Sequence, residues 1–401
     1  MINAKYILKV KIFALLLFVF SIPFENWNPF GISSFFSVTK MAGVVYAVMA
    51  ILLPKMSFSF ERQVFLPFKV LGLFYLLLSL ISIFNYNGQN QLSPVNFTLF
   101  QNIISYWLIA SDLNKRNVNM NKIFLSFTFS IILMGILIVL GIGLGSEYVE
   151  GETRLTFFNN NANMLGVFTG VALTFTIYFI LNSHQTYGNK VYLLLFSLPL
   201  FVNMLLSSGS RGALISTVLS VLTLILLNRD KKYKKMIQYL VLILGGSFLL
   251  DKLMESNVMY ERILITVEMG SLGERDTLWR DALKIFNESP FIGNGSTGFE
   301  RRMIIVYGRF QDTHNLFLYI MATTGIIGLM IFFYFLYFHL KASVRTYAKE
   351  RNPIKLIILL FYITTVIKAG GVINSKLMWL LLALIIALPV KFDKKQIITK
   401  S

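Results

Sequence analysis

The chain has 401 residues, of which 56% are hydrophobic and 14% are charged, and its formal net charge is +18. Soluble domains carry about a quarter charged residues, so this composition excludes an ordinary soluble protein and predicts one embedded in lipid. Because the sequence has no cysteine, disulfide bonds, thiolate metal sites and a cysteine nucleophile are excluded as well.

Long apolar stretches recur along the whole chain. A membrane-spanning helix needs about 20 mostly apolar residues, and about 12 stretches approach that length. They lie near 7–23, 38–54, 64–84, 95–111, 123–145, 162–182, 190–207, 212–228, 236–250, 314–338, 354–373 and 375–391. The first ends in SIPFENWNPF without a small-residue cleavage site, so we interpret it as a retained helix and not as a signal peptide.

These stretches predict an all-α integral membrane protein with about 12 transmembrane helices and a single membrane domain. Residues 1–150 hold the first five helices and residues 151–250 the next four. Residues 251–313 form one long extracytoplasmic loop with short helices, and residues 314–401 hold the last three transmembrane helices.

The distribution of lysine and arginine predicts the orientation. If the amino terminus is cytoplasmic, basic residues gather in every inner segment, as in 229–235 and 341–355, whereas the short outer loops hold few. By the positive-inside rule, both termini are then cytoplasmic. The positive net charge is thereby explained by topology, and we expect no nucleic-acid partner.

The first outer segment of chemical interest is ETRLTFFNNNANMLG, at the start of the sixth span. Arg154, Asn161 and Asn163 can donate hydrogen bonds to sugar hydroxyls or phosphate, although capping and turn formation explain the asparagines equally well. We interpret the three glutamates within 147–152 as part of a solvated loop.

Arg211 lies in LLSSGSRGALIST, a very short outer turn between the seventh and eighth spans. Ser210 and its neighbours precede a helix amino terminus, whose free N–H groups favour an anion. The planar guanidinium adds bidentate binding of phosphate. The alternative is an arginine that only extends its side chain to the membrane surface.

The long outer loop contains SLGERDTLWRDALKIFNESPFIGNGSTGF, which predicts an amphipathic helix between Gly273 and Pro290. Arg275 and Trp279 share its apolar face, an unusual place for an arginine on a solvated helix. An ordinary surface arginine packed over Trp279 is the alternative. The glycine-rich turn IGNGSTGF matches no nucleotide-binding fingerprint.

His314 begins DTHNLFLYIMATTGIIGLM, at the outer end of the tenth span. A neutral imidazole with a pKa near working pH is the usual general base, although interfacial histidines also simply cap helices. Asn315 beside it is a candidate substrate contact, and we interpret His184 and His339 as structural. Two anion-binding arginines and a base on one side of the membrane fit a substrate with a diphosphate leaving group and a hydroxyl nucleophile.

Three segments resemble the bacterial O-antigen ligase and O-antigen polymerase superfamily: SRGAL at 210–214, RDTLW with PFIGNGSTGF within 275–299, and HNLFLYIMATTGIIGL at 314–329. The resemblance implies a glycosyltransferase of surface polysaccharide biosynthesis in the bacterial cytoplasmic (inner) membrane. Its donor would be an undecaprenyl-diphosphate-linked glycan, and its acceptor a sugar hydroxyl of a glycan or lipid-linked sugar on the periplasmic face.

The same resemblance assigns the diphosphate to Arg211 and Arg275 and activation of the acceptor hydroxyl to His314. Substrate contacts are expected from Arg154, Asn163, Ser210, Trp279 and Asn315. Two positions depart from the family pattern: Ala162 stands where proline is frequent, and Thr323 where an acidic residue is frequent.

We expect no cofactor and no metal, since the outer segments lack an Asp-x-Asp pair and a histidine cluster. A polymerase is favoured on general grounds, and a ligase that transfers O-antigen to the lipid A core uses the same chemistry. A polysaccharide or lipid transporter, or a flippase, is the alternative from another class, but the two halves of the chain lack the repeats typical of transporters.

Overall fold

The computed structural model describes residues 4–29, 31, 37–84, 94–149, 152–182, 188–228, 232–269, 275–308, 312–369 and 371–387. His184 and Gly273 lie outside these residues. The described chain is mostly helical, which confirms that part of the expectation, and one short hairpin departs from it.

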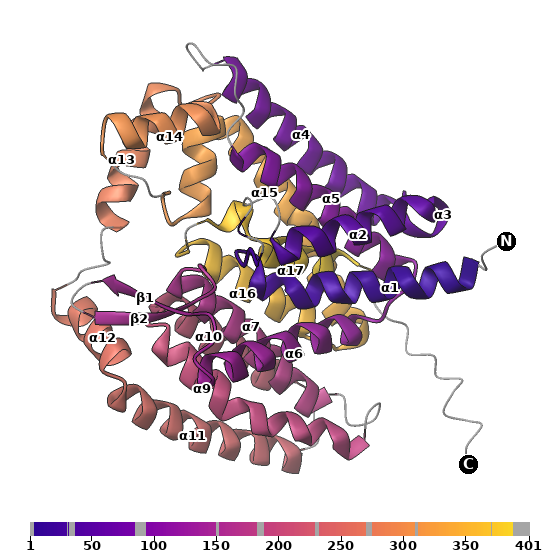
Figure 1. Ribbon diagram of the computed structural model, residues 1–401, viewed down its shortest axis with the longest axis vertical. Helices are drawn as coiled ribbons and strands as arrows, with labels where there is room; N and C mark the ends of the chain where they lie inside the picture. Colours follow the sequence, from indigo (N-terminus) through magenta and orange to yellow (C-terminus); the bar gives the residue numbers. More distant parts are fainter. Residues whose placement is uncertain are drawn as a thin grey trace.

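The helices, with η for a 3-10 helix, are α1 Ala4–Ser21, η1 Ile22–Phe24, α2 Val38–Leu52, α3 Pro54–Ser57, α4 Arg62–Phe84, α5 Pro94–Asn114, α6 Met120–Val139, α7 Ala162–Asn182, η3 Gly188–Ser197, α9 Leu198–Ser207, α10 Arg211–Leu227, α11 Lys232–Glu255, α12 Asn257–Met269, α13 Arg275–Glu288, α14 Gly295–Ile305, α15 Leu316–Glu350, α16 Ile354–Val366, η4 Val372–Asn374 and α17 Lys376–Ile386. The strands are β1 Leu144–Val149 and β2 Glu152–Phe157. Figure 1 shows how these elements are arranged.

A helix lies at each of the predicted spans, but not every one is long and apolar enough to cross a membrane. Six candidates meet that test among the described residues: Lys5–Phe24, Arg62–Phe84, Met120–Val139, Ala162–Asn182, Gly188–Ser207 and Leu316–Glu350. The helices α2, α10, α16 and α17 are apolar but shorter. The structure therefore supports a multi-pass membrane protein, while the full set of 12 spans stays a prediction.

The hairpin of β1 and β2 is the main correction to the all-α expectation. Helix α6 ends at Val139, short of the predicted limit near residue 145, and two glycines with positive φ follow at Gly141 and Gly143. The strands then pair antiparallel, with Glu147 opposite Arg154. Glycine in the left-handed region ends a helix readily, and this releases the chain into the hairpin.

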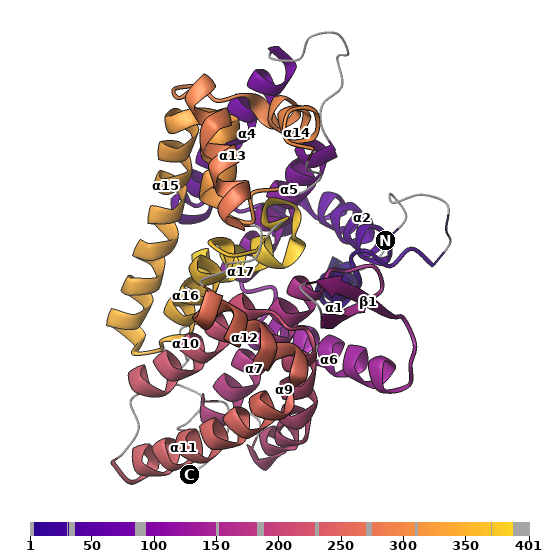
Figure 2. The ribbon, with the colours of Figure 1, turned by 90° about the vertical axis from the view of Figure 1, so that its left-hand side faces the viewer.

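The segment predicted as one long outer loop is largely helical. It contains the end of α11 together with α12, α13 and α14. The amphipathic helix is confirmed as α13, which begins at Arg275 and buries Leu278 and Ala282. Figure 2 shows α13 and α14 beside α15 and α4, which both contact α14.

Helix α15 is broken at Gly325, where φ is +63° and ψ is −168°. The glycine-rich turn after α13 occupies the break: the carbonyl oxygen of Pro290 accepts a hydrogen bond from the amide of Ile326 at 2.9 Å. The amide of Asn294 in turn donates to the carbonyl of Ala322 at 3.1 Å. A Cβ at Gly325 would lie 2.2 Å from the Phe291 carbonyl oxygen, so only glycine fits here. This turn is part of the framework that holds α15.

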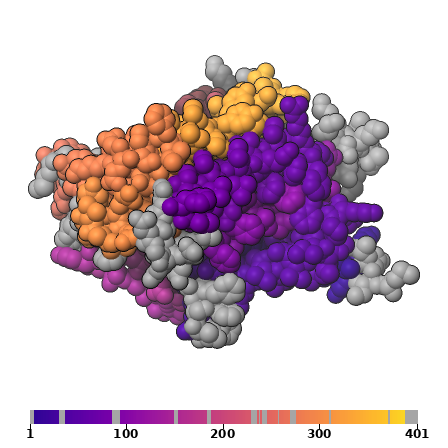
Figure 3. All heavy atoms as spheres, turned by 90° about the horizontal axis from the view of Figure 1, so that it is seen from above, coloured from indigo at the N-terminus to yellow at the C-terminus, as the bar shows by residue number. Residues whose placement is uncertain are grey.

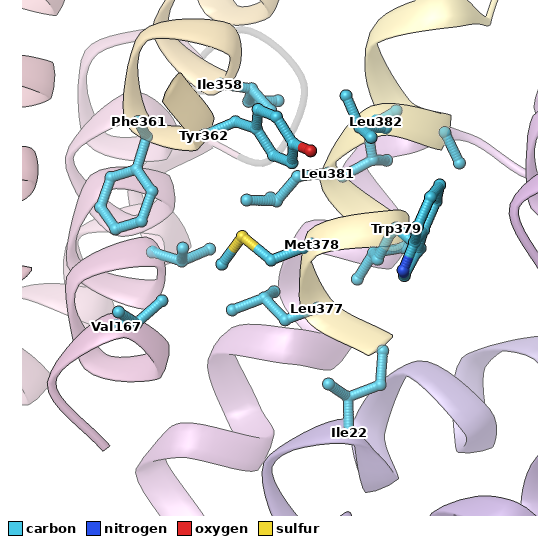
Figure 4. Packing of buried hydrophobic residues seen from close by; sticks show 14 of the residues in the cluster. Ile22, Val167, Ile358, Phe361, Tyr362, Leu377, Met378, Trp379, Leu381 and Leu382 are labelled. Atoms are coloured by element: carbon cyan, nitrogen blue, oxygen red, sulfur yellow. The ribbon is translucent and has the colours of Figure 1, made fainter. Parts of the chain in front are cut away.

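The centre of the molecule is formed by α16 and α17. All residues of α17 from Leu377 to Ile386 are buried, as expected for a helix that is apolar on every side. Figure 4 shows Tyr362 of α16 close to Met378 and Leu381 of α17. In Figure 3 the orange atoms lie directly against the purple atoms of the amino-terminal helices, in agreement with the contact between α14 and α4.

Candidate active site

Arg154 on β2 is buried and links the hairpin to two helices. Its Nε donates to the carbonyl of Ser208 at 2.9 Å, and its Nη2 donates to Oδ1 of Asn163 at 2.8 Å. Its Nη1 lies 3.8 Å from Oε2 of Glu147 on the opposite strand. Burial, followed by the positive charge of Arg262, lowers the pKa of Arg154 to about 10.

The turn before α10 places the next arginine. Ser210 caps α10 through its hydroxyl, which accepts a hydrogen bond from the amide of Ala213 at 3.4 Å. Gly209 has a φ of +59°, and a Cβ there would meet Val258 at 2.9 Å and Arg154 Nε at 3.2 Å. Glycine at this position therefore allows the hairpin, the turn and α12 to approach one another.

Arg211 lies at the start of α10 and reaches across to α12. Its Nη1 donates to the carbonyl of Arg262 at 2.9 Å and also contacts the hydroxyl of Thr266. Arg262 is itself buried, with 6% of its surface exposed. The guanidinium of Arg211 is thus anchored on the backbone of Arg262 near the amino terminus of α10, and the charges of both arginines act on Arg154. Positive charge at a helix amino terminus favours a bound anion.

Helix α13 contributes two of the predicted residues. Arg275 is its first residue, and its charge acts on both Arg154 and His314, which places it beside them. The indole Nε1 of Trp279 donates to the carbonyl of Thr313 at 3.0 Å. Trp279 therefore fixes the backbone next to His314, and direct contact of its ring with substrate stays a prediction.

The loop before α15 holds His314 in a left-handed conformation, with a φ of +49°. Its amide donates to Oδ1 of Asp312 at 2.9 Å, and the Thr313 hydroxyl donates to the carbonyl of Asn315 at 2.6 Å. Asn315 caps α15, because its Oδ1 accepts from the amides of Phe317 and Leu318. These local bonds, typical of turns that begin with aspartate or threonine, fix the backbone that carries the imidazole.

The surroundings of the His314 imidazole favour its neutral form. Its Nδ1 is buried and has no hydrogen-bond partner among the residues that the structure describes. Burial lowers the pKa of His314, the carboxylate of Asp312 raises it, and the charge of Arg275 lowers it. A neutral imidazole with a vacant ring nitrogen can accept a proton from a hydroxyl group.

The structure thus brings Arg154, Arg211, Arg275 and His314 into one region from four distant parts of the chain. Asn163 contacts Arg154, whereas Ser210 and Asn315 act as helix caps, and Trp279 holds the His314 loop. His339 is buried within α15 beside Tyr106, in agreement with its structural interpretation.

Three charged residues of this region were missed in the sequence. Arg262 lies in the apolar pattern of NVMYERILITVEM, where an isolated arginine was the available signal. Glu147 was interpreted as solvated, yet its charge acts on Arg154 and His314. Asp312, two residues before the histidine, contacts the His314 amide and was not singled out.

Residues 194–333 match the family model described as O-antigen ligase. The chain is also 29% identical over 174 residues to a protein of Pseudomonas aeruginosa named O-antigen ligase. Both comparisons support a resemblance to the O-antigen ligase and polymerase superfamily. The alignment covers 43% of this chain and 38% of the relative, so the chain spans less than half of that protein.

The segment that matches the family model runs from the end of η3 into α15. It contains Arg211, Arg262, Arg275 and His314, together with the glycine-rich turn that occupies the break in α15. Arg154 and the hairpin lie outside it, so the family model covers one wall of the candidate site and the amino-terminal part of the chain supplies another.

Proposed function

We propose that this protein is a glycosyltransferase of surface polysaccharide synthesis that moves a saccharide from undecaprenyl diphosphate to a sugar hydroxyl. The observation that carries the proposal is a cluster of charges: Arg211, Arg262 and Arg275 act on Arg154, and Arg154 and Arg275 act in turn on His314. The Nδ1 of His314 is buried and has no hydrogen-bond partner among the described residues. The similarity of residues 194–333 to the O-antigen ligase family model, and of the chain to a protein named O-antigen ligase, supports the same assignment.

The arginines supply what the leaving group needs. Arg154, Arg211, Arg262 and Arg275 are like charges in a partly buried region, where an anion of two or more negative charges relieves their mutual repulsion. A diphosphate gains negative charge as the glycosidic bond breaks. Positioned donors that meet such developing charge contribute roughly 3 kcal/mol each to lowering the barrier.

His314 completes the reaction as the general base. Its neutral imidazole accepts the proton of the acceptor hydroxyl while the hydroxyl oxygen attacks the anomeric carbon, a step worth on the order of 10²–10⁴-fold in rate. The attack displaces the diphosphate directly and so inverts the anomeric configuration. Because guanidinium groups supply the positive charge, we propose that the reaction needs no metal ion or cofactor.

The proposed place of the reaction follows from the charge pattern of the sequence. The site residues belong to segments that the positive-inside rule assigns to the outer side of the bacterial inner membrane. Both termini would then be cytoplasmic, and the lipid carrier would reach the site from the bilayer. A reporter fused after Asn315 that is active only in the cytoplasm contradicts this orientation.

The identity of the acceptor substrate distinguishes a polymerase from a ligase. A polymerase, the function predicted from the sequence, adds the glycan to a carrier-linked repeat unit. A ligase, the activity in the name of the Pseudomonas aeruginosa relative, would transfer the finished glycan to a lipid core. Deletion of the gene followed by gel analysis separates them: single-repeat products indicate a polymerase, and accumulated long carrier-linked chains indicate a ligase.

The test of the chemistry compares two arginines of α13. Arg275→Gln and His314→Ala are expected to abolish glycan transfer without loss of protein from the membrane. Arg280→Gln is the matched control, since Arg280 is exposed on the same helix and bonds only to the carbonyl of Asp276 among the contacts described. Wild-type glycan in the Arg275→Gln or His314→Ala strain would overturn the assignment.

A further inference from the structure

A polar pocket of about 320 Å³ lies beside the candidate site and has no role in the proposed reaction so far. Its walls come from the end of η1, the start of α2, α5, the start of α7, and the segment around η4. Small-molecule pockets range from about 300 to 1,000 Å³, so the pocket is large enough for a small ligand.

Hydrogen bonds and an ion pair among the lining residues hold the wall of this polar pocket in place. Asn26 donates from Nδ2 to Oδ1 of Asn160 at 3.0 Å, and Asn160 donates to the carbonyl of Pro23 at 3.1 Å. On the other side, Glu25 and Lys376 form an ion pair at 3.5 Å, and the Lys376 amide also donates to the Glu25 carboxylate. These bonds hold the polar groups in place before any ligand arrives.

Two further polar atoms of the pocket residues are left without a bond. Oδ1 of Asn374 and Oγ of Ser375 are buried and find no hydrogen-bond partner in the described part of the chain. Ser375 is only 4% exposed. Buried polar groups are nearly always satisfied, and an exception needs an explanation such as a ligand.

The chemistry of the lining points to a polyhydroxylated ligand. Ligand pockets are usually lined by apolar and aromatic side chains, but this one is lined mainly by asparagine, serine, threonine, lysine and glutamate. Amide and hydroxyl side chains both donate and accept hydrogen bonds, which is what a ring bearing several hydroxyl groups requires.

The polar pocket adjoins the base through a short chain of contacts. Gly371 lines the pocket, and its amide donates to Oδ2 of Asp312. The other oxygen of Asp312 accepts the bond from the His314 amide. On the opposite wall, Asn161 lies two residues before Asn163, the partner of Arg154. A ligand in the pocket therefore lies next to the region where the sugar reacts.

We propose that the polar pocket binds a saccharide residue of the glycan substrate and positions it beside His314. This inference rests on the proposed function, because it names the part of the substrate that the arginines do not hold. Donor and acceptor glycans both carry such residues, so the ligand is a hydroxyl-rich sugar ring from one of these two sources.

The test uses the full-length protein in lipid nanodiscs with His314→Ala, so that no turnover takes place. Saturation-transfer NMR measures binding of the repeat-unit oligosaccharide released from the host's surface polysaccharide, and binding of undecaprenyl diphosphate is measured separately. The pocket variants are Ser375→Ala and Asn374→Ala. Ser220→Ala is the matched control, because Ser220 Oγ is also buried without a bond among the described residues but lies in α10.

We expect the paired variant Asn374→Ala and Ser375→Ala to bind the oligosaccharide about 10-fold more weakly, with undecaprenyl diphosphate unaffected and Ser220→Ala unchanged. Unchanged oligosaccharide binding in the paired variant overturns the inference. So does a selective loss of undecaprenyl diphosphate binding, which would assign the pocket to the diphosphate.

Kinetics with His314 intact then identify the source of the sugar. The pocket variants should raise KM for the donor if they hold the donor sugar, and for the acceptor if they hold the acceptor sugar; an unchanged KM for both contradicts the inference. Failure of the proposed function is recognised separately, because wild-type protein would then form no glycan product at all.

Discussion

Arg211 donates a hydrogen bond from Nη1 to the main-chain carbonyl of Arg262 at 2.9 Å, so one guanidinium is anchored on the backbone that carries the other. Like charges held together in a partly buried place destabilise the free protein unless they meet an anion. This relationship makes Arg262 a test of the diphosphate assignment.

We expect Arg262→Gln to lower kcat/KM for glycan transfer on the order of 10²-fold, because a positioned charge that meets the leaving group is lost. The measurement is the initial rate with carrier-linked glycan at fixed protein level. Arg301→Gln serves as the control, since Arg301 is exposed on α14. Equal rates for Arg262→Gln and wild type would remove Arg262 from the anion site.

The pH dependence of transfer should reveal the environment of His314. Burial lowers the pKa of this imidazole in the folded protein, and only the neutral form accepts a proton. Activity is therefore lost as the pH falls through a pKa below the ordinary value of about 6.5. The pH profile of kcat/KM measures this acidic limb.

A substitution at Asp312 should shift this acidic limb of the pH profile in a defined direction. Its carboxylate raises the pKa of His314, so Asp312→Asn should move the acidic limb to still lower pH. Asparagine keeps an oxygen that can accept the bond from the His314 amide. A limb that moves to higher pH in Asp312→Asn contradicts this account of the base.

Trp279→Phe tests whether the loop before α15 must be held in place. The substitution keeps an aromatic ring but removes the hydrogen bond from Nε1 to the carbonyl of Thr313. We expect kcat to fall roughly 10-fold with little change in KM, because a displaced base slows the chemical step more than binding. Trp107→Phe is the control: its indole bonds to the carbonyl of Ser59 elsewhere in the molecule.

The break in α15 predicts a clear effect on stability. Gly325→Ala places a Cβ 2.2 Å from the Phe291 carbonyl and forces alanine to a φ of +63°, which alone costs about 1–2 kcal/mol. We expect less folded protein and a lower Tm in detergent. Gly72→Ala, in the helical part of α4 with no atom within 4 Å of the new Cβ, should leave Tm unchanged or slightly higher.

Transfer is also expected to persist when divalent metal ions are removed by EDTA, because the arginines carry out the charge stabilisation. The assay compares initial rates before and after chelation. Loss of transfer that returns with Mg²⁺ or Mn²⁺ would contradict the metal-free mechanism.

Hydropathy predicted the helices well, because lipid demands long apolar segments whatever the tertiary structure. The start of α13 at Arg275 was also predictable from local signals, namely an acidic first turn and a proline beyond the end. These features depend only on residues that are close together in the sequence, so local sequence patterns are enough to predict them.

The hairpin and the broken helix depend on distant contacts and were not predictable in the same way. A glycine in an apolar run is common in transmembrane helices, so Gly325 gave no sign that the turn at Pro290–Phe291 would take over its hydrogen bonds. The place of Arg262 in the candidate site was not predictable for a similar reason. It depends on interactions with Arg211 and Arg154, which lie about 50 and 110 residues away in the sequence.

Because the turn after α13 supplies hydrogen-bond acceptors for the second half of α15, residues 290–294 and 322–327 form one structural unit. Chimeras that exchange this region between this chain and a relative should therefore move the turn and the helix together. A junction placed between them would combine the turn of one protein with the broken helix of the other, and the hydrogen bonds between the two would be lost.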